Sequence, residues 1–216
     1  MQAYEEVGQL CPQVNFNLVL VNVLKSELKE MRKKRIGDLI FPLVSVLDDS
    51  IGCAIWFASR GRGVLGHDGG QSYQSPARCL LLGMGADEQL GGYSKHKTAF
   101  LNGGREHLLA EVQRQIEAIS ERNLGRDNRV VSDHSLAGRF PYLDERVVNY
   151  LASIPLDAKM NLALNRGVGD KIILRAAAQT LGLVRTAAEP KRAIQFGSKI
   201  AKLENSKEKG SDLALR

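Results

Sequence analysis

Short apolar runs alternate with charged stretches along this chain, and their lengths separate expected strands from expected helices. Residues 15–23 (NFNLVLVNV) and 79–84 (CLLLGM) are rich in Val and Leu and predict two buried strands. The charged stretch 24–35 is rich in helix formers and predicts an exposed helix. Residues 62–78 contain Gly, Ser and Gln with one proline, so they predict a loop.

A helix is predicted within LDDSIGCAIWFASRG, residues 47–61. Asp49 or Ser50 is the expected N-cap, because short polar side chains bond the free N–H groups of a first turn. Gly61 is the expected stop. The residues expected on its apolar face are Ile51, Ala54, Ile55 and Ala58.

Three more amphipathic helices are predicted in the second half of the chain. The first covers about 106–122, the second starts near Asp144 and stops at Pro155, and the third runs from Asp170 to Gly182. The apolar face of the first is formed by Leu108, Leu109, Val112, Ile116 and Ile119. Strands interleaved with helices in front and helices behind predict an α/β class with a mostly helical C-terminal half.

Composition narrows the class of protein. A hydrophobic share of 44% in 216 residues is ordinary for a globular chain, and no apolar run approaches the roughly 18 residues of a membrane span. The net charge of +6 permits an anionic partner, but no nucleic-acid-binding motif accompanies it. We therefore expect no nucleic acid and no membrane. With no secretory leader at the start, the expected location is cytoplasmic.

The three cysteines are Cys11, Cys53 and Cys79, an odd number without paired spacing. They predict neither a disulfide framework nor a zinc site. Cys53 and Cys79 lie in apolar runs and are expected to be buried thiols.

The run LLLGMGADEQLGGY, residues 80–93, carries the strongest candidate chemistry. Gly83 and Gly85 follow an expected strand, where glycines let backbone N–H groups approach a phosphate. Asp87 and Glu88 come next, and adjacent carboxylates can hold Mg²⁺ beside substrate phosphates. The alternative is a turn followed by an acidic helix start, which the helix dipole favours. The residues alone leave both open.

Residues 123–147 concentrate arginines and aspartates around Phe140-Pro141-Tyr142. Such density indicates either ion pairs that position loops or the wall of a polar site. His134 beside Asp133 suggests a general base, but no nucleophile motif accompanies it, so this idea is discounted.

Lys171 falls at the start of the predicted helix 170–182. The N-terminal end of a helix is already positive, so the helix does not stabilise a cation at this position. A bound anion would stabilise it.

Three stretches, in this order, resemble motifs of the asparagine synthetase family. They are GMGADEQLGGY (83–93), GRFPYLD (138–144) and KIILR (171–175), and the basic PKRAIQFGS (190–198) follows. The family pattern is a strand with SG-(D/E)-G-(A/S)-DE-x-x-GGY, then RxPxLD, then a K-x-x-LR helix. The resemblance covers about residues 15–200.

The resemblance implies a reaction and its reactants. Family members use ATP and Mg²⁺ to adenylate the side-chain carboxylate of aspartate, with release of pyrophosphate. Ammonia, supplied from glutamine by an N-terminal glutaminase domain, then attacks the activated acyl group and forms asparagine. The implied fold is a parallel sheet of the adenine-nucleotide α-hydrolase type, here truncated.

The resemblance also implies a role for each matching position. Asp87 would bind Mg²⁺ with the pyrophosphate, and Glu88 would support it as a second ligand and in catalysis. Lys171 would neutralise charge on the phosphates and on the tetrahedral intermediate. Lining roles for the nucleotide or the pocket fall to Gly83, Gly85, Arg139, Asp144, Lys191 and Arg192.

Departures from the family pattern bear on activity. The pyrophosphate loop Ser-Gly-Gly-x-Asp-Ser is not found, and the nearest string, residues 45–50 (SVLDDS), lacks both glycines and is interpreted as a helix cap. Gln2 stands where glutaminase domains carry a cysteine nucleophile. Met84 and Ala137 stand where synthetases carry acidic residues, and a methionine thioether cannot replace a carboxylate.

Two functions remain open from the family motifs, and a third, nucleic-acid binding, is motivated only by the positive charge. The first is an ATP-dependent asparagine synthase-like ligase domain, inactive as this chain alone because the phosphate loop would lie upstream. The second is a catalytically silent relative that acts as a binding or scaffold module. The expected organisation is a partial synthetase domain over residues 1–198 and a polar tail or frayed helix over 199–216, with an open sheet edge where strands are lacking.

Overall fold

The computed structural model describes residues 1–66 and 70–200, which form two compact units, described separately below. The first unit comprises Met1–Phe16, Gly83–Ile119 and Phe140–Lys191. The second comprises Asn17–Leu82, Ser120–Arg139 and the described part of the stretch from Arg192. The expected C-terminal tail lies outside the described residues from position 201 onward.

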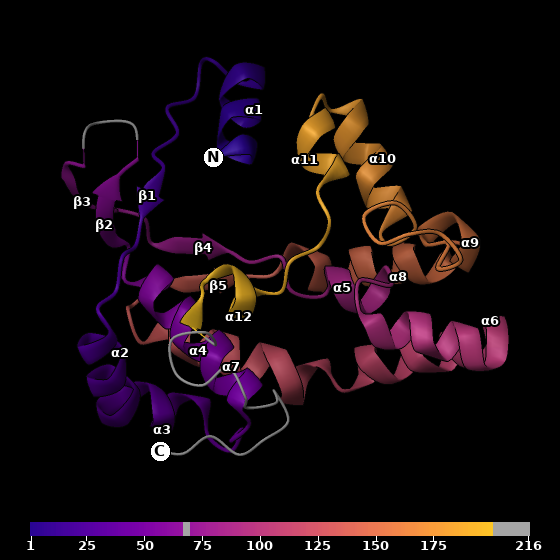
Figure 1. The fold of residues 1–216 in the computed structure, drawn as a ribbon, viewed down its shortest axis with the longest axis horizontal. Helices are drawn as coiled ribbons and strands as arrows, with labels where there is room; N and C mark the ends of the chain where they lie inside the picture. Colours follow the sequence, from indigo (N-terminus) through magenta and orange to yellow (C-terminus); the bar gives the residue numbers. More distant parts are fainter. Residues whose placement is uncertain (67–69, 201–216) are drawn as a thin grey trace. The chain divides into compact units, whose positions relative to one another are not determined.

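The regular secondary structure described for the first unit is all helical (Figure 1). Its elements are α1 (Gln2–Leu10), α5 (Ala86–Gln89), α6 (Ser94–Glu117), the 3-10 turn Pro141–Leu143, α8 (Glu145–Ser153), α9 (Leu156–Lys159), α10 (Ile172–Thr180) and α11 (Val184–Ala188). The mostly helical character predicted for the C-terminal half is confirmed for this unit.

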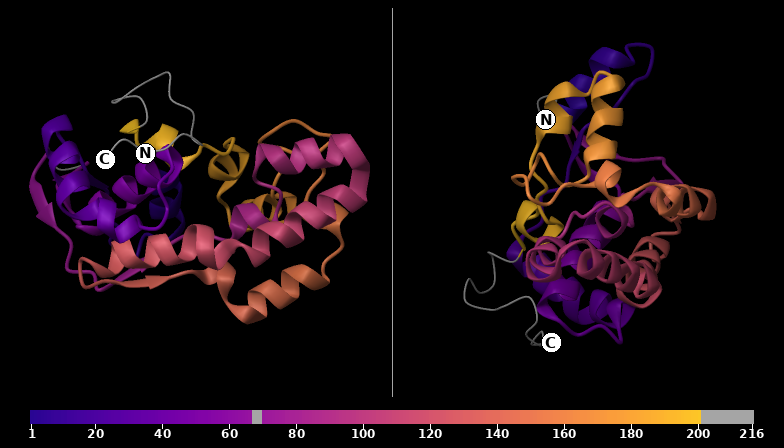
Figure 2. Two further views of the ribbon diagram at one scale, coloured as in Figure 1. Left: turned by 90° about the horizontal axis from the view of Figure 1, so that it is seen from below. Right: turned by 90° about the vertical axis from the view of Figure 1, so that its right-hand side faces the viewer.

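Helix α6 is two helical arms joined at a glycine pair. Gly103 and Gly104 leave the helical conformation, with φ of −154° and +63° respectively, and the arms fold back against each other (Figure 2). Glycine permits this reversal because a left-handed conformation carries no Cβ penalty there. The predicted helix 106–122 is thus the second arm of α6, which ends at Glu117.

The apolar core of the first unit lies between that second arm and α9. Its buried residues are Leu108, Val112, Leu156, Met160 and Leu162, with Phe100 and Ile116 packed against them. Leu109, predicted on the same face, is instead 56% exposed. Residue 109 is one position beyond 108, so a rotation of about 100° carries it away from the core.

Helices α8 and α10 occur where they were predicted. Asp144 is the N-cap of α8 and accepts a hydrogen bond from the Arg146 N–H at 3.0 Å, while Leu151 provides the buried face. Helix α10 ends before Gly182, whose φ of +92° matches the expected stop. Lys171 is the residue before α10 rather than part of its first turn.

The second unit combines helices with two small sheets. Its helices are α2 (Lys25–Met31), α3 (Gly37–Ile40), α4 (Val46–Ser59), α7 (Gly125–Ser132) and α12 (Ile194–Gly197), with π-helical segments at Arg32–Ile36 and Ser120–Leu124. Its strands are β1 (Val19–Leu20), β2 (Arg62–Leu65), β3 (Ser72–Gln74), β4 (Cys79–Leu81) and β5 (Ala137–Arg139).

The two sheets differ in direction. Strands β1, β2 and β3 pair antiparallel in that order, whereas β4 and β5 pair parallel, with Cys79 opposite Ala137. The mixed α/β class with a small parallel sheet is therefore confirmed. The specific nucleotide-hydrolase fold stays a prediction, because two parallel strands do not define a strand order.

Three details of the predicted strands are wrong. The first strand spans two residues rather than 15–23, and the predicted loop 62–78 contains the β2–β3 hairpin. Strand β4 forms as predicted but is not buried, since Leu81 is 73% exposed and Cys79 is exposed too. Cys79 and Leu81 are two positions apart and lie on the same face of the strand, so their exposure means that no layer is packed over this face. Within the described part of the chain, β4 pairs with β5 alone. Cys53 is buried, as predicted.

Helix α4 begins earlier than predicted. Ser45, not Asp49 or Ser50, is its N-cap, and the Ser45 hydroxyl oxygen accepts from the Asp48 N–H at 3.1 Å. Gly61 follows its end with φ of +63°, as expected. The predicted apolar face is wrong in part, because Ala58 is exposed and the buried face instead carries Cys53, Ile55, Trp56 and Phe57.

No helix in the described ranges is both long and apolar enough to cross a lipid bilayer.

A buried arginine joins α4 and α7 within the second unit. The guanidinium of Arg126, 3% exposed, bonds Asp48 on α4 at 2.6 Å and Asp127 on its own helix at 2.8 Å. Asp127 is fully buried. Carboxylates packed around a buried guanidinium depend on it for charge compensation, so removing the cation is costly.

Replacing Arg126 should therefore unfold the second unit readily. We expect Arg126→Ala to lower the free energy of unfolding by about 3–5 kcal/mol, because it leaves buried carboxylates without their cation. Urea unfolding followed by circular dichroism measures this loss. Lys34→Ala is the control, because it removes an exposed pair with Glu30 and should leave the unfolding curve nearly unchanged.

A carboxylate on α1 holds the start of α11 in the first unit. The two oxygens of Glu6 accept from the backbone N–H groups of Arg185 and Thr186, both at 2.7 Å, and from the Thr186 hydroxyl at 2.5 Å. The hydroxyl bond from Thr186 is the largest cause that lowers the pKa of Glu6 below its ordinary value of 4.5.

This contact should make stability depend on pH. Because the pKa of Glu6 is lower in the folded state than its ordinary value of 4.5, ionised Glu6 stabilises the folded protein fully above pH 4.5. This stabilisation is lost as the pH falls through the folded-state pKa of Glu6. The Glu6→Gln variant should thus be less stable than wild type at pH 7, and the difference in stability between the two should shrink in acid. Urea midpoints between pH 7 and pH 3 check this. Glu5→Gln, which removes only a loose exposed pair with Arg185, should show no such trend.

Candidate functional site

The candidate site begins at the turn before α5 in the first unit. Gly85 is the N-cap of α5, with φ of +95°, and a Cβ there would collide with the side chain of Leu143. Packing and backbone conformation therefore both require glycine at 85. Gly83, in contrast, has open space where a Cβ would lie. The packing therefore does not require glycine at position 83. The role predicted for Gly83, letting a ligand approach the backbone closely, stays a prediction.

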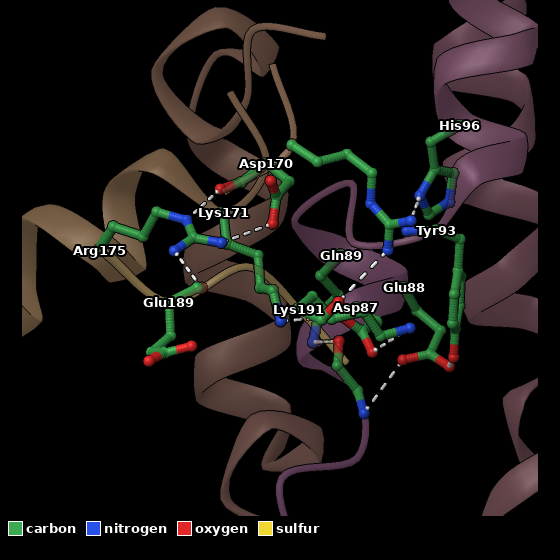
Figure 3. A network of polar contacts seen from close by, with 12 residues as sticks. Asp87, Glu88, Gln89, Tyr93, His96, Asp170, Lys171, Arg175, Glu189 and Lys191 are labelled. Carbon is green, nitrogen blue, oxygen red and sulfur yellow. Dashed lines mark hydrogen bonds and ion pairs between the residues drawn. The ribbon is translucent and has the colours of Figure 1, made fainter. Parts of the chain in front are cut away.

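The Asp87 carboxylate is the centre of the site. Its Oδ1 lies 2.9 Å from the Nζ of Lys171, and its Oδ2 lies 3.2 Å from the Nζ of Lys191 (Figure 3). We call these three residues the lysine–aspartate cluster. Their side chains are 16–23% exposed, so the ion pairs are shielded without being sealed from solvent.

Gly92 leaves the space that the Asp87 carboxylate occupies. The Gly92 N–H donates to the Asp87 carbonyl oxygen at 2.9 Å, which closes the turn after α5. A Cβ on residue 92 would occupy the space of the Asp87 carboxylate. The second glycine of the GGY sequence is thus required by the acid five residues earlier.

Glu88 is directed away from the cluster and into the protein. It is 3% exposed, its Oε2 accepts from the Gly85 N–H at 3.2 Å, and its Oε1 accepts from the Tyr93 hydroxyl at 2.5 Å. Both oxygens are therefore engaged in holding the turn and the tyrosine. Figure 3 shows Glu88 and Tyr93 together on the α6 side of the cluster.

The Tyr93 ring supports the second lysine. The Nζ of Lys191 lies 4.6 Å from the centre of this ring, within the range of a cation–π interaction. Lys95 approaches the same ring at 5.4 Å and also lies 3.8 Å from Glu111. Tyr93 was not predicted as a site residue, although its place at the end of the GGY sequence was the available signal.

His96 is buried behind Tyr93, 0% exposed. Its Nδ1 accepts a hydrogen bond from the Tyr93 N–H at 3.3 Å. Burial is the main reason that the pKa of His96 is lowered to about 4, so the ring is neutral at pH 7. It thus adds no charge to the site and acts as a fixed acceptor for the backbone of residue 93.

Lys171 is held by its backbone as well as by its charge. It has φ of +53°, a conformation that non-glycine residues rarely adopt, and its N–H donates to the Leu90 carbonyl oxygen at 2.9 Å. Strain of this kind persists where the surrounding structure fixes the residue, and it clusters at functional sites. Next to it, Asp170 pairs with Arg175 at 2.8 Å and anchors the start of α10.

The predicted site residues are only partly brought together. Asp87 and Lys171 meet directly, and Glu88 and Gly85 shape the turn beside them. Asp144 serves as the cap of α8. Arg139 belongs to the second unit, where its exposed guanidinium donates to the Gly138 carbonyl oxygen at 3.4 Å, so its share in anion binding stays a prediction.

The carboxylates do not fit a resident Mg²⁺ ion. Both oxygens of Glu88 accept hydrogen bonds, and both oxygens of Asp87 face ammonium groups. No group of three or more His, Cys, Asp or Glu side chains suited to a metal ion occurs among residues 1–66 and 70–200. The chemistry of the donors favours an anion here instead.

Comparison with known proteins defines the class of domain. The asparagine synthase family model matches residues 101–206. With this match and the relatives below, the resemblance to the asparagine synthetase family is confirmed, and the chain contains an asparagine synthase-like domain.

The chain is similar to asparagine synthetase domain-containing proteins of animals. It is 55% identical to asparagine synthetase domain-containing protein 1 of Bos taurus over 96% of this chain and 33% of that protein. The Homo sapiens protein of the same name is 52% identical over 96% of this chain and 32% of its own length. A putative asparagine synthetase (glutamine-hydrolyzing) 1 of Methanocaldococcus jannaschii is 28% identical over 76% of this chain and 29% of its own length. The chain spans about a third of the length of these relatives.

The placement of Glu88 generates a test of its role. We expect Glu88→Ala to lower the free energy of unfolding by about 1–3 kcal/mol, because it removes the acceptor that the buried Gly85 N–H and the partly buried Tyr93 hydroxyl share. Combining it with Tyr93→Phe should cost less than the sum of the two single changes, since both remove the same bond. Urea unfolding of the four proteins measures this. Strictly additive losses would contradict the shared contact.

Proposed function

We propose that this chain is part of an ATP-dependent amide-forming ligase of the asparagine synthase type, and that the lysine–aspartate cluster binds the phosphates of the nucleotide. The observation that carries the proposal is the ion pair between Asp87 and Lys171, two residues 84 positions apart in the sequence that match separate family motifs. An arrangement of two cations around one carboxylate has surplus positive charge for an anionic ligand.

The proposed role of each group follows from its charge and position. Lys171 would bind phosphate oxygens and neutralise the charge that develops on them during adenylation of aspartate, since such transfers depend on preplaced cations. Its fixed backbone keeps the ammonium at the site before the ligand arrives. Buried Glu88 would act only through the turn and Tyr93, not as an acid or base.

The other reactants come from the resemblance. Aspartate would be the acceptor, and ammonia drawn from glutamine would be the amide donor. Mg²⁺ often keeps several waters and binds through substrate phosphates plus one or two carboxylates. We therefore propose that any Mg²⁺ enters with ATP. The groups that complete the reaction would lie in other parts of a longer protein, so amide synthesis by this chain alone is not expected.

One observation favours a second function. Met84 replaces an acidic residue of the family pattern, and both oxygens of Asp87 are already neutralised by lysines. A silent relative, which keeps the fold as a binding or scaffold module, would have no use for nucleotide. Nucleotide binding therefore separates the two functions.

The test is nucleotide binding by the 216-residue chain. With ATP and Mg²⁺ at ten times the dissociation constant, binding should raise the free energy of unfolding by about 1.4 kcal/mol. Lys171→Ala should reduce the thermal shift because it removes one of the two cations. Differential scanning fluorimetry and calorimetry measure both effects.

Lys33→Ala is the control, because Lys33 is exposed in the second unit and changes the net charge equally. Absence of any shift with ATP, or an equal loss in both variants, would overturn the proposal and favour the scaffold function.

A further inference from the structure

A small pocket in the first unit shares no residue with the lysine–aspartate cluster. Its volume is about 330 Å³, at the lower end of the range for small-molecule sites. The second arm of α6, the end of α8 and the turn into α9 form its walls, and these helices are labelled in Figure 1. Residues of the walls include Arg105, Leu109, Ile154, Pro155, Leu156 and Lys159.

Lys159 is a buried cation without a carboxylate partner. It is 6% exposed, and its Nζ donates to the Leu151 carbonyl oxygen at 2.8 Å. Within the described part of the chain, it makes no other hydrogen bond and no ion pair. Burial lowers the pKa of the Lys159 ammonium below its ordinary value of 10.5, and no neighbouring carboxylate raises it. A buried charge is costly unless it is paired, so an anion in this pocket would be bound favourably.

The end of α8 accounts for one of the three ammonium protons of Lys159. Leu151 belongs to the last turn of this helix, where carbonyl groups lack partners within the helix and carry partial negative charge. Lys159 therefore caps α8. An ammonium group has three donors and the cap uses one of them, so two remain available to a ligand.

Arg105 is a second cation that lines the pocket. Its guanidinium pairs with Asp157, but the two side chains are 56% and 80% exposed. An ion pair so open to solvent contributes little, so the guanidinium can turn toward a ligand without a large loss of stability. The planar guanidinium matches a carboxylate in shape and binds it through two parallel hydrogen bonds.

The rest of the wall that Arg105 and Lys159 border is largely apolar. Leu109 is 56% exposed, and Ile154, Pro155 and Leu156 line the same pocket. A short hydrocarbon group placed here would remove the exposed part of Leu109 from water, which favours binding in proportion to the area covered.

We propose that this pocket binds a small carboxylate with a short apolar tail. The Lys159 ammonium and the Arg105 guanidinium hold the carboxylate, and the tail packs against Leu109. Lys159 thus has two roles, as the cap of α8 and as a ligand-binding residue. The inference does not rest on the proposed nucleotide site, because the two sites have no residue in common.

The probe for this site is 3-methylbutanoate, added to the full 216-residue chain and followed by the backbone N–H signals in NMR. The signals of residues 105–109 and 151–159 should shift and reach saturation. The neutral amide 3-methylbutanamide has the same shape without the charge, and acetate lacks the tail. Each should bind at least about fivefold more weakly, because each loses one of the two kinds of contact.

Variants separate the two kinds of contact. Arg105→Gln should weaken binding of 3-methylbutanoate about fivefold, the effect of losing a charge-assisted hydrogen bond in a partly exposed place. Leu109→Ala should weaken 3-methylbutanoate but leave acetate unchanged. Arg146→Gln is the matched control, because it removes an arginine of the same unit that is 93% exposed and pairs with Asp144.

Lys159→Met should abolish binding. Because this change also removes the cap of α8, circular dichroism and urea unfolding first establish whether the variant folds. If it does not fold, Arg105→Gln and Leu109→Ala decide the outcome, since both change exposed side chains.

Saturable shifts at the pocket that weaken in Arg105→Gln and persist in Arg146→Gln and Lys171→Ala support the inference. Three results would overturn it: no saturable shift, equal binding of the carboxylate and its amide, or unchanged binding by Arg105→Gln. Shifts at residues 83–93 in place of the pocket would overturn it too, because the carboxylate would then occupy the lysine–aspartate cluster. In each of these cases Lys159 serves as the cap of α8 alone.

Discussion

The attraction between one carboxylate and two ammonium groups organises the candidate site. Asp87 follows the turn at Gly85, Lys171 precedes α10, and Lys191 follows α11, so one acidic side chain draws three segments of the first unit to one point. Ion pairs at this degree of exposure contribute only modestly to stability. Their arrangement bears on the proposed binding, because two ammonium groups around one carboxylate leave surplus positive charge at this point.

The residues around this point serve it in distinct ways. Gly92 leaves room for the carboxylate, and Glu88 fixes the turn and Tyr93 through hydrogen bonds. Neutral His96 holds the backbone of Tyr93 without adding a charge. The two adjacent acids of the motif are thus divided between a charged contact, at Asp87, and a buried hydrogen-bonded support, at Glu88.

The second unit is stabilised by a different kind of electrostatic contact. Arg126 is enclosed by Asp48 and Asp127, and Asp133 accepts from Arg35 and from the Trp56 indole N–H. These bonds explain the dense charges of residues 123–133 as structural pairing, which was one of the two interpretations left open. Arg35 is the first cause of the lowered pKa of Asp133, which keeps that carboxylate ionised. His134 stacks near Trp56, and burial lowers its pKa.

Local signals in the sequence determined the helices with clear caps and stops. Asp144 before α8 and Gly182 after α10 act through bonds and backbone angles within a few residues, so they could be recognised without the fold. The motifs likewise predicted that Asp87 and Lys171 lie at one site, and the ion pair between them confirms that the two side chains meet. Only the tertiary structure decided strand burial, as at Leu81, because burial depends on which neighbours a strand acquires. It also decided that Glu88 turns inward and that Lys191 lies on Tyr93, since contacts between distant segments are set by packing rather than by spacing along the chain.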